Sequence, residues 1–264
     1  MKNSTYKALM LDVDGTIVSY HKEFYKLLPS KRVTEAIQQA SKQLTVCFTT
    51  GRPYSMMTKI LSHIKMEKGY AIINDGAQVI DLASGDILYE RVMSKTDIRS
   101  ICSILKQMRI SFFINDNEQE LLFTDSYKPE KPLNILVRFC YAEKTIDKMI
   151  DKLTHIPLIK ANKTHGGEGD NFGLVVSHAE ATKLHGIYEV SKLLGIKRVE
   201  SIGVGDSGND FSLLMACGLK VAMGNALPAL KEIADYVAPS VEDDGVADVI
   251  EKFVLNKNKN NQNA

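Results

Sequence analysis

The stretch YKALMLDVDGT, residues 6–16, decides the fold. Its apolar run ends in Asp12, Asp14 and Gly15, which is typical of a parallel strand that is buried on both faces and ends in a loop. Two carboxylates two residues apart at a strand end project into one pocket, and like charges that close are costly unless a cation neutralises them. The stretch therefore predicts the first strand of an α/β sheet, with a charged site at its end.

Strands and helices alternate on both sides of a central segment that has a different character. The flanking parts predict strands at 44–49, 70–74, 198–204 and 220–223, and helices from Ser30, at 181–194, 210–217 and 229–234, and after Gly245. The central segment predicts strands at 111–114, 121–124, 134–141, 157–162 and 172–177, and helices at 94–107 and 144–153. Strands outnumber helices there, which favours a separate α+β module with an antiparallel sheet.

We therefore expect one α/β core domain formed by residues 1–82 and 181–255. An α+β domain at 83–180 is inserted into it. The segment 256–264 is rich in Asn and Lys, which is typical of a disordered tail.

Composition excludes several classes of protein. The 264 residues carry a net charge of +1, and Lys and Arg are spread along the chain, so nothing favours binding to nucleic acid or to a membrane surface. The four cysteines lie far apart without a CxxC pair, so we expect buried free thiols. No signal peptide and no apolar run long enough for a bilayer are evident, and we expect a cytoplasmic protein.

Four stretches carry residues that suit phosphate chemistry: Asp12–Thr16, Thr50–Arg52, Lys183 and Gly205–Asp210. Strand ends in an open parallel sheet are where ligands bind. Carboxylate oxygens suit Mg²⁺, whereas lysine, threonine and backbone amides suit phosphate oxygens. A carboxylate can also serve as the covalent nucleophile for a phosphoryl group. Each stretch alone is a weak signal, but their order and placement together predict a phosphoryl-transfer site.

These residues resemble the motifs of the haloacid dehalogenase superfamily, in particular its Cof-type (subclass IIB) phosphatases. The four motifs occur in the family's order, and Val221–Ala226, Ala234-Asp235 and Glu242–Ala247 continue the likeness. The inserted domain falls between the second and third motifs, where this subfamily carries an α+β cap. The resemblance implies a Rossmann-like core with a cap, and a Mg²⁺-dependent phosphatase that acts on a small phosphorylated metabolite through an aspartyl-phosphate.

The resemblance also implies roles for the matched acids. Asp12 would be the nucleophile and a metal ligand. Asp14 would protonate the leaving oxygen, then activate water, and would give its main-chain carbonyl to Mg²⁺. Asp206 would bind Mg²⁺ directly, with Asp210 as a second or water-mediated ligand.

The phosphate would be held by residues from all four motifs. These are Thr50, the amides of Gly51 and Val13, Lys183 and Asn209. Outside the motifs the chain departs from the family at two places. Asp75 stands where relatives usually have Asn before Gly-Ala, and residues 178–182 replace a turn that usually contains Pro and Gly.

Three further residues are candidates for contacting the rest of the substrate. Arg52 follows the phosphate-holding pair, and His165 lies in a Gly-rich loop of the inserted domain. Arg138, in the middle of a predicted strand, is a candidate for binding an acidic group or for pairing with a neighbour. Sugar phosphates, nucleotides and cofactor phosphates all remain open as substrates, as does the oligomeric state.

Three other functions compete with this interpretation. Gly203–Gly208 spells GxGxxG, but Asp206 would point a carboxylate at a dinucleotide's pyrophosphate, and no acid ends the following strand. A phosphomutase would use the same core residues, so the motifs leave it open. A non-catalytic module that binds Mg²⁺ and phosphate would need neither the acid at Asp14 nor a large inserted domain.

Overall fold

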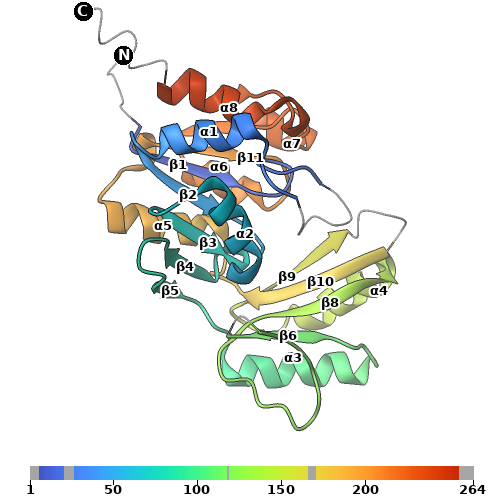
Figure 1. The fold of residues 1–264 in the computed structure, drawn as a ribbon. Coiled ribbons are helices and arrows are strands. Elements are labelled where there is room, and N and C mark those ends of the chain that lie inside the picture. Colours follow the sequence, from blue (N-terminus) through green and yellow to red (C-terminus); the bar gives the residue numbers. More distant parts are fainter. Residues whose placement is uncertain (1–5, 21–26, 118, 166–170, 256–264) are drawn as a thin grey trace, which may run out of the picture. The chain divides into compact units, whose positions relative to one another are not determined.

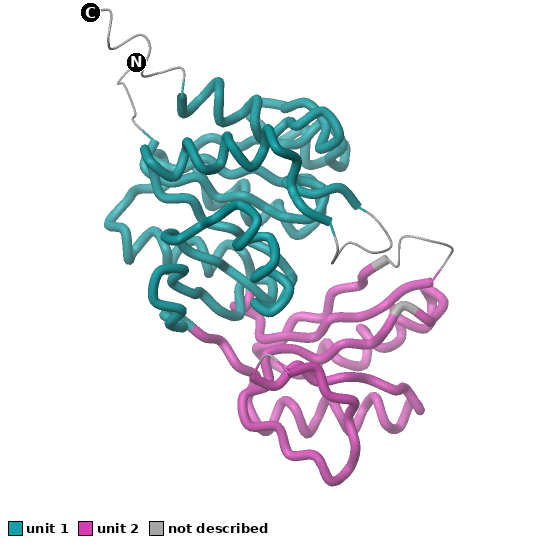
Figure 2. The backbone as a smooth tube through the Cα atoms, in the orientation of Figure 1, with its two compact units in different colours: residues 1–89, 182–264 teal, residues 90–181 magenta. Residues whose placement is uncertain are grey.

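The computed structural model describes residues 6–20, 27–117, 119–165 and 171–255. The chain divides into two compact units (Figure 2): residues 1–89 and 182–264 form unit 1, and residues 90–181 form unit 2. The sequence assigned residues 83–89 to the inserted domain. They belong to unit 1 because β5 (Ile87–Glu90) is an edge strand of its sheet. The expected tail at 256–264 lies outside the described residues.

Unit 1 is an α/β domain, as the sequence predicts, and it is built around an eight-stranded sheet. The sheet order is β13-β12-β11-β1-β2-β3-β4-β5. The strands besides β5 are β1 (Ala8–Asp12), β2 (Thr45–Thr49), β3 (Tyr70–Ile73), β4 (Gln78–Asp81), β11 (Ser201–Gly205), β12 (Leu219–Ala222) and β13 (Tyr236–Val237). The six strands from β13 to β3 are parallel, and β4 runs antiparallel to β3.

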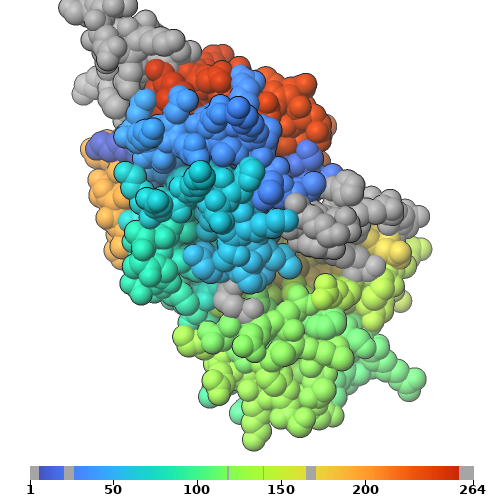
Figure 3. Space-filling model, in the orientation of Figure 1, coloured from blue at the N-terminus to red at the C-terminus, as the bar shows by residue number. Residues whose placement is uncertain are grey.

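Helices cover both faces of this sheet (Figure 1). They are α1 (Lys31–Ala40), α2 (Tyr54–Ile64), α5 (Lys183–Leu194), α6 (Asp210–Ala216), α7 (Pro228–Glu232) and α8 (Gly245–Ile250). The space-filling view shows α1 in blue beside the red C-terminal helices (Figure 3), and Arg32 pairs there with Glu251 at 2.8 Å. Because helices cover both faces, Ala8–Leu11 of β1 are fully buried.

The order of the strands predicts a ligand site at the end of β1. From β1 the sheet grows through β2 and β3 to one side, whereas β11, β12 and β13 follow one another on the other side. The direction of growth therefore reverses between β1 and β11. In open α/β sheets the crevice at such a reversal, beyond the carboxyl ends of the strands, is where ligands bind.

Unit 2 is an α+β module with an antiparallel sheet, as expected. Its five strands run in the order β7-β6-β8-β10-β9, with every pairing antiparallel. Its elements are α3 (Lys95–Gln107), β6 (Phe113–Asp116), β7 (Gln119–Leu122), β8 (Pro132–Ala142), α4 (Glu143–Leu153), β9 (Ile159–His165) and β10 (Asn171–His178). Apolar residues of α3 and α4 form a second core with one face of this sheet. The predicted cap of α3 is confirmed, since Ser94 Oγ accepts a hydrogen bond from the Asp97 amide at 3.0 Å.

Local backbone effects shift several predicted boundaries. Residues 198–200 form a 3₁₀ turn, so β11 begins only at Ser201; the Glu200 carboxylate folds back to accept from the Lys197 amide at 2.7 Å. Leu158 has a left-handed backbone (φ 58°), so β9 begins at Ile159. All four cysteines are free, but Cys140 is exposed rather than buried. Among the described residues no helix is long and apolar enough to cross a membrane.

A close backbone contact fixes the start of α5 against the β3–β4 connection. Gly76 has a φ of +97°, and a Cβ there would lie 2.0 Å from the carbonyl oxygen of Thr182. Thr182 caps α5, its side chain accepting from the His185 amide. Only glycine fits this contact, which positions the next residue, Lys183.

Gly76 and Gly85 provide a matched pair of substitutions. Both have a positive φ, but no atom lies within 4 Å of a Cβ at Gly85. We expect Gly85→Ala to cost only the left-handed strain of about 1 kcal/mol. Gly76→Ala should cost about 3 kcal/mol or more, because the Thr182 backbone must also move. Urea unfolding followed by circular dichroism measures both, and equal losses would contradict the contact.

Candidate active site

Parallel pairing brings three distant segments together at the end of β1. Asp12 is the last residue of β1 and is buried. β11 and β2 flank β1, with Asp12 in register with Thr49. Asp206 follows β11 and Thr50 follows β2, so the loops that carry them lie beside Asp12.

The ammonium of Lys183 lies between two carboxylates. Its Nζ donates to Asp12 Oδ1 at 2.5 Å and to Asp210 Oδ1 at 2.6 Å. Burial alone would lower the pKa of the Lys183 ammonium, but Asp12 and Asp210 outweigh it and raise the pKa. Lys183 is 1% exposed. It is therefore a buried cation, not the surface lysine that its position in the sequence alone would indicate.

Asp210 holds the loop that carries Asp206. Its Oδ2 accepts from the backbone amides of Asp206 and Ser207, both at 2.9 Å, and from Ser207 Oγ at 3.1 Å. A Cβ at Gly205 would lie 2.5 Å from the Asp210 carboxyl carbon, so only glycine admits this carboxylate. The loop amides that would bind a dinucleotide's pyrophosphate are thus already used by Asp210. This geometry argues against the GxGxxG interpretation.

Asp12, Asp206 and Asp210 form a buried acidic cluster. One oxygen from each lies within 4.8 Å of the others. Lys183 pairs with Asp12 and Asp210 and, among the described residues, the three buried carboxylates outnumber this ammonium, so the cluster has a surplus of negative charge. Burial, reinforced by Asp210 and opposed by Lys183, raises the pKa of Asp12 well above its usual range. Burial and Asp210 also raise the pKa of Asp206 to about 7. A divalent cation with oxygen ligands would remove this electrostatic cost, so the donor set fits a metal ion.

Asp14 is held by an arginine. Arg52 donates from Nε to Asp14 Oδ2 at 2.9 Å and from Nη2 to Asp14 Oδ1 at 2.5 Å. The Arg52 side chain is only 3% exposed, whereas that of Asp14 is 24% exposed. A two-point contact with a planar guanidinium fixes the orientation of the carboxylate as well as its position. Arg52, which the sequence suggested as a substrate residue, therefore contacts Asp14, the predicted acid.

The predicted phosphate-binding residues meet beside the same edge. Thr50 Oγ1 accepts from the Arg52 amide at 3.1 Å, and the Asp75 amide donates to the Thr50 carbonyl at 3.0 Å. The Asp75 carboxylate in turn accepts from Asn209 Nδ2 at 3.0 Å. It also faces Gly51, where a Cβ would lie 3.3 Å from each of its oxygens. Asp75, which departs from the family pattern, thus links Asn209 to the Thr50-Gly51 turn.

Val13, the other predicted phosphate ligand, begins the turn after β1. It is buried, and its carbonyl accepts from the amides of Thr16 and Ile17 at 3.3 and 2.9 Å. This turn keeps residue 13 close to Asp12.

The two candidates in unit 2 are placed differently. Arg138 on β8 is paired with Glu120 and lies over the ring of Phe113, 4.6 Å from its centroid. Of the two alternatives for Arg138, binding an acidic group or pairing with a neighbour, the structure therefore shows a neighbouring partner. His165 ends β9, in register with Phe172, but its side chain lies outside the described residues.

Two residues that the sequence did not single out support the site. Thr16 Oγ1 donates to Asp206 Oδ1 at 3.3 Å, linking the first and fourth motifs. Asn225 Nδ2 donates to the Gly15 carbonyl at 2.8 Å, and its Oδ1 accepts from the Val241 amide at 2.9 Å. Asn225 lies in the Val221–Ala226 stretch that carries the family resemblance, which was the one available signal.

Comparisons with known proteins show which family the chain belongs to. The family model for haloacid dehalogenase-like hydrolases matches residues 9–128 and 115–250. The protein named "Putative phosphatase YxeH" of Bacillus subtilis (strain 168) is 26% identical over 275 residues, covering 96% of this chain and 100% of that protein. The 5-amino-6-(5-phospho-D-ribitylamino)uracil phosphatase YcsE of the same organism is 26% identical over 255 residues, covering 94% and 96%.

A solved structure shares the fold. BT1666 of Bacteroides thetaiotaomicron, a phosphatase of the haloalkanoate superfamily, superposes with a TM-score of 0.79 at 21% identity, covering 96% of each chain. The family model spans most of the sequence and includes the motifs around Asp12, Thr50, Lys183 and Asp206. The chain therefore belongs to the haloacid dehalogenase-like hydrolase family, as its motifs predict.

Proposed function

We propose that this phosphoric monoester hydrolase depends on Mg²⁺ and forms an aspartyl-phosphate on Asp12. The observation that carries the proposal is the position of Asp12, whose carboxylate ends the central strand β1 with Lys183 on one oxygen and Asp206 nearby. An oxygen nucleophile beside an ammonium and a metal-binding carboxylate is the arrangement that phosphoryl transfer requires.

Each residue has a defined task in the two steps. A carboxylate oxygen of Asp12 attacks phosphorus, the bond to the leaving oxygen breaks, and Asp14 gives its proton to that oxygen. A water molecule then attacks phosphorus, Asp14 takes a proton from the water, and the bond to Asp12 breaks to release inorganic phosphate. Mg²⁺, held by Asp12 and Asp206, would neutralise charge on the phosphoryl oxygens.

Lys183 and Asp210 act together in this proposal. An ammonium has three N–H donors, and Asp12 and Asp210 accept two of them. In this proposal the third N–H donates to a phosphate oxygen. The Thr50 hydroxyl, Asn209 and the amides of Gly51 and Val13 bind the phosphate with it. Asp210 orients Lys183 and the Asp206 loop, and it lies close enough to serve as a second or water-mediated ligand.

Arg52 would position the acid rather than contact substrate. Its guanidinium fork holds the Asp14 carboxylate at both oxygens. Asp14 must acquire a proton before it can act as acid, so we propose that the pair loosens when substrate binds.

The substrate is a small phosphorylated metabolite, which is what the relatives support. YcsE is named for a phosphorylated ribityl compound. We further propose that unit 2 serves as the cap of this family and sets substrate preference. Hydrolysis and phosphoryl transfer within one sugar would share the core residues, and the relatives' names favour hydrolysis.

The nucleophile is tested by Asp12→Asn. We expect it to lower Mg²⁺-dependent hydrolysis of p-nitrophenyl phosphate by about four orders of magnitude, because an amide is not a competent nucleophile. Asp151→Asn makes the same change at an exposed position of α4 and should leave turnover unchanged. A folded Asp12→Asn protein with undiminished turnover would sink the mechanism.

The acid–base pair is tested by Asp14→Asn and Arg52→Lys. The aryloxide of an aryl phosphate leaves without needing a proton, so Asp14→Asn should still form the phosphorylated Asp12 from this substrate and should accumulate it. Hydrolysis of alkyl phosphates, whose leaving oxygen needs a proton, should be lost almost completely. Arg52→Lys keeps the charge but not the fork, so kcat should fall by about tenfold to a hundredfold with little change in KM. Intact-protein mass spectrometry and steady-state kinetics give both readouts. A rise in KM alone would assign Arg52 to substrate binding instead.

The metal site is tested by thermal unfolding with and without Mg²⁺. A hundredfold excess of Mg²⁺ over its Kd should stabilise the wild-type chain by about 2.7 kcal/mol. Asp206→Asn should remove most of that gain because it replaces a charged ligand of the acidic cluster with a neutral amide. Asp151→Asn serves again as the control. Equal stabilisation of all three proteins would place the metal elsewhere.

A further inference from the structure

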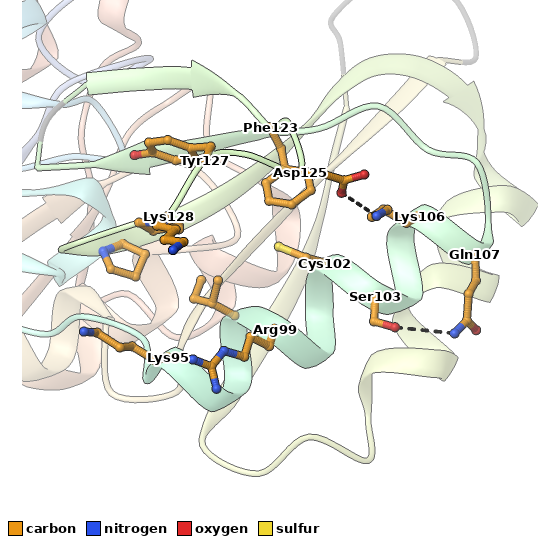
Figure 4. A pocket seen from close by; sticks show the side chains of 13 residues that line it. Lys95, Arg99, Cys102, Ser103, Lys106, Gln107, Phe123, Asp125, Tyr127 and Lys128 are labelled. Carbon is orange, nitrogen blue, oxygen red and sulfur yellow. Dashed lines mark hydrogen bonds and ion pairs between the residues drawn. The ribbon is translucent and has the colours of Figure 1, made fainter.

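Unit 2 contains a cavity that the catalytic residues do not use. It has a volume of about 640 Å³ and lies between α3 and the segment 123–132 (Figure 4). All of its lining residues belong to unit 2, whereas Asp12, Asp14, Lys183 and Asp206 belong to unit 1. Its size is within the range of pockets that enclose small organic ligands.

One stripe of α3 forms a wall of this cavity. The lining residues of α3 follow one another at spacings of three and four residues, which places their side chains on one helix face. They are Lys95, Ile98, Arg99, Cys102, Ser103, Lys106 and Gln107. Ile98 and Cys102 are buried and continue into the core of unit 2. Opposite them Phe123 stacks on Phe112, with ring centroids 4.7 Å apart. This part of the lining is apolar and offers a flat aromatic surface.

The rim of the cavity is basic. Lys95, Arg99 and Lys128 are exposed, and within the described ranges no carboxylate pairs with any of them. Lys106 differs, because it pairs with Asp125; Figure 4 shows that pair away from the other three cations. Three cations without acidic partners around one cavity leave a local positive charge that favours an anion.

The wall that carries Lys128 is anchored rather than loose. The Asp116 carboxylate accepts from the Tyr127 hydroxyl and from the amides of Glu130 at 2.9 Å and Lys131 at 2.5 Å. The Pro132 carbonyl accepts from the Met93 amide at 2.9 Å. The turn is therefore tied at its end and in its middle, so the cavity is formed without a ligand, and binding pays little ordering entropy.

We propose that this cavity binds a nucleotide-sized organic phosphate, with the phosphates on Lys95, Arg99 and Lys128 and the base against Phe123 and Ile98. The volume of the cavity exceeds what a bare phosphate would fill, and a bare phosphate would make no use of the aromatic and aliphatic lining. None of the proposed catalytic residues is among the residues that line this cavity. In this proposal the ligand is an effector of the enzyme and not the ester that is hydrolysed.

The probe is adenosine 5′-(α,β-methylene)diphosphate, whose terminal P–C bond a phosphatase cannot hydrolyse. Calorimetry with the full chain and Mg²⁺ compares the wild type with Arg99→Gln/Lys128→Gln. We expect the double variant to bind about tenfold more weakly or worse while hydrolysing p-nitrophenyl phosphate as the wild type does. Lys148→Gln/Lys152→Gln removes the same charge from exposed positions of α4 and should bind normally.

Ser103→Trp separates a shaped site from general electrostatic attraction. Ser103 lines the cavity and is exposed, so a large side chain there fills the space without changing the charge. Ser103→Trp should lose binding of the nucleotide analogue, and inorganic phosphate should bind the wild type more weakly than the analogue does. No measurable binding to the wild type, or equal binding to the wild type and Arg99→Gln/Lys128→Gln, overturns the proposal. Unchanged binding to Ser103→Trp also overturns it.

Discussion

The ammonium of Lys183, buried between Asp12 and Asp210, is the interaction on which the catalytic unit depends. Taking an ion out of water costs several kcal/mol even after the protein relaxes, so a buried lysine persists only where carboxylates and hydrogen bonds compensate. Here two carboxylates do so, and Asp206 adds a third negative charge beside them. This surplus of negative charge is the physical reason to expect a metal ion at the cluster.

The surrounding backbone is shaped by the need to hold these charges together. Gly76 admits the start of α5, which carries Lys183, and Gly205 admits the Asp210 carboxylate. Asp210 then organises the loop that presents Asp206. The Gly76 contact joins segments that are distant in sequence, whereas the two contacts of Asp210 shape a single loop. Together they account for a site built at the end of one buried strand, β1.

Much of this arrangement could be predicted from the sequence, because apolar runs followed by acids mark the ends of buried parallel strands. The α/β core, the inserted α+β module and the cap of α3 at Ser94 follow from local patterns. The pairing of Arg52 with Asp14 and of Asn209 with Asp75 could not be predicted from local patterns. The first two residues are 38 positions apart in the sequence and the second two are 134 positions apart, so each pair meets only in the folded chain. Local signals failed likewise at Leu158, whose left-handed backbone delays β9, because a leucine carries no sign of that conformation.

The most direct test is a crystal structure with Mg²⁺ and vanadate, which mimics the phosphoryl group in transfer. We predict Mg²⁺ within ligand distance of Asp12 and Asp206, vanadium bonded to a carboxylate oxygen of Asp12, and the Lys183 ammonium in contact with a vanadate oxygen. A metal ion away from Asp12 and Asp206, or vanadium bonded to a residue other than Asp12, would contradict the central claim that Asp12 receives the phosphate.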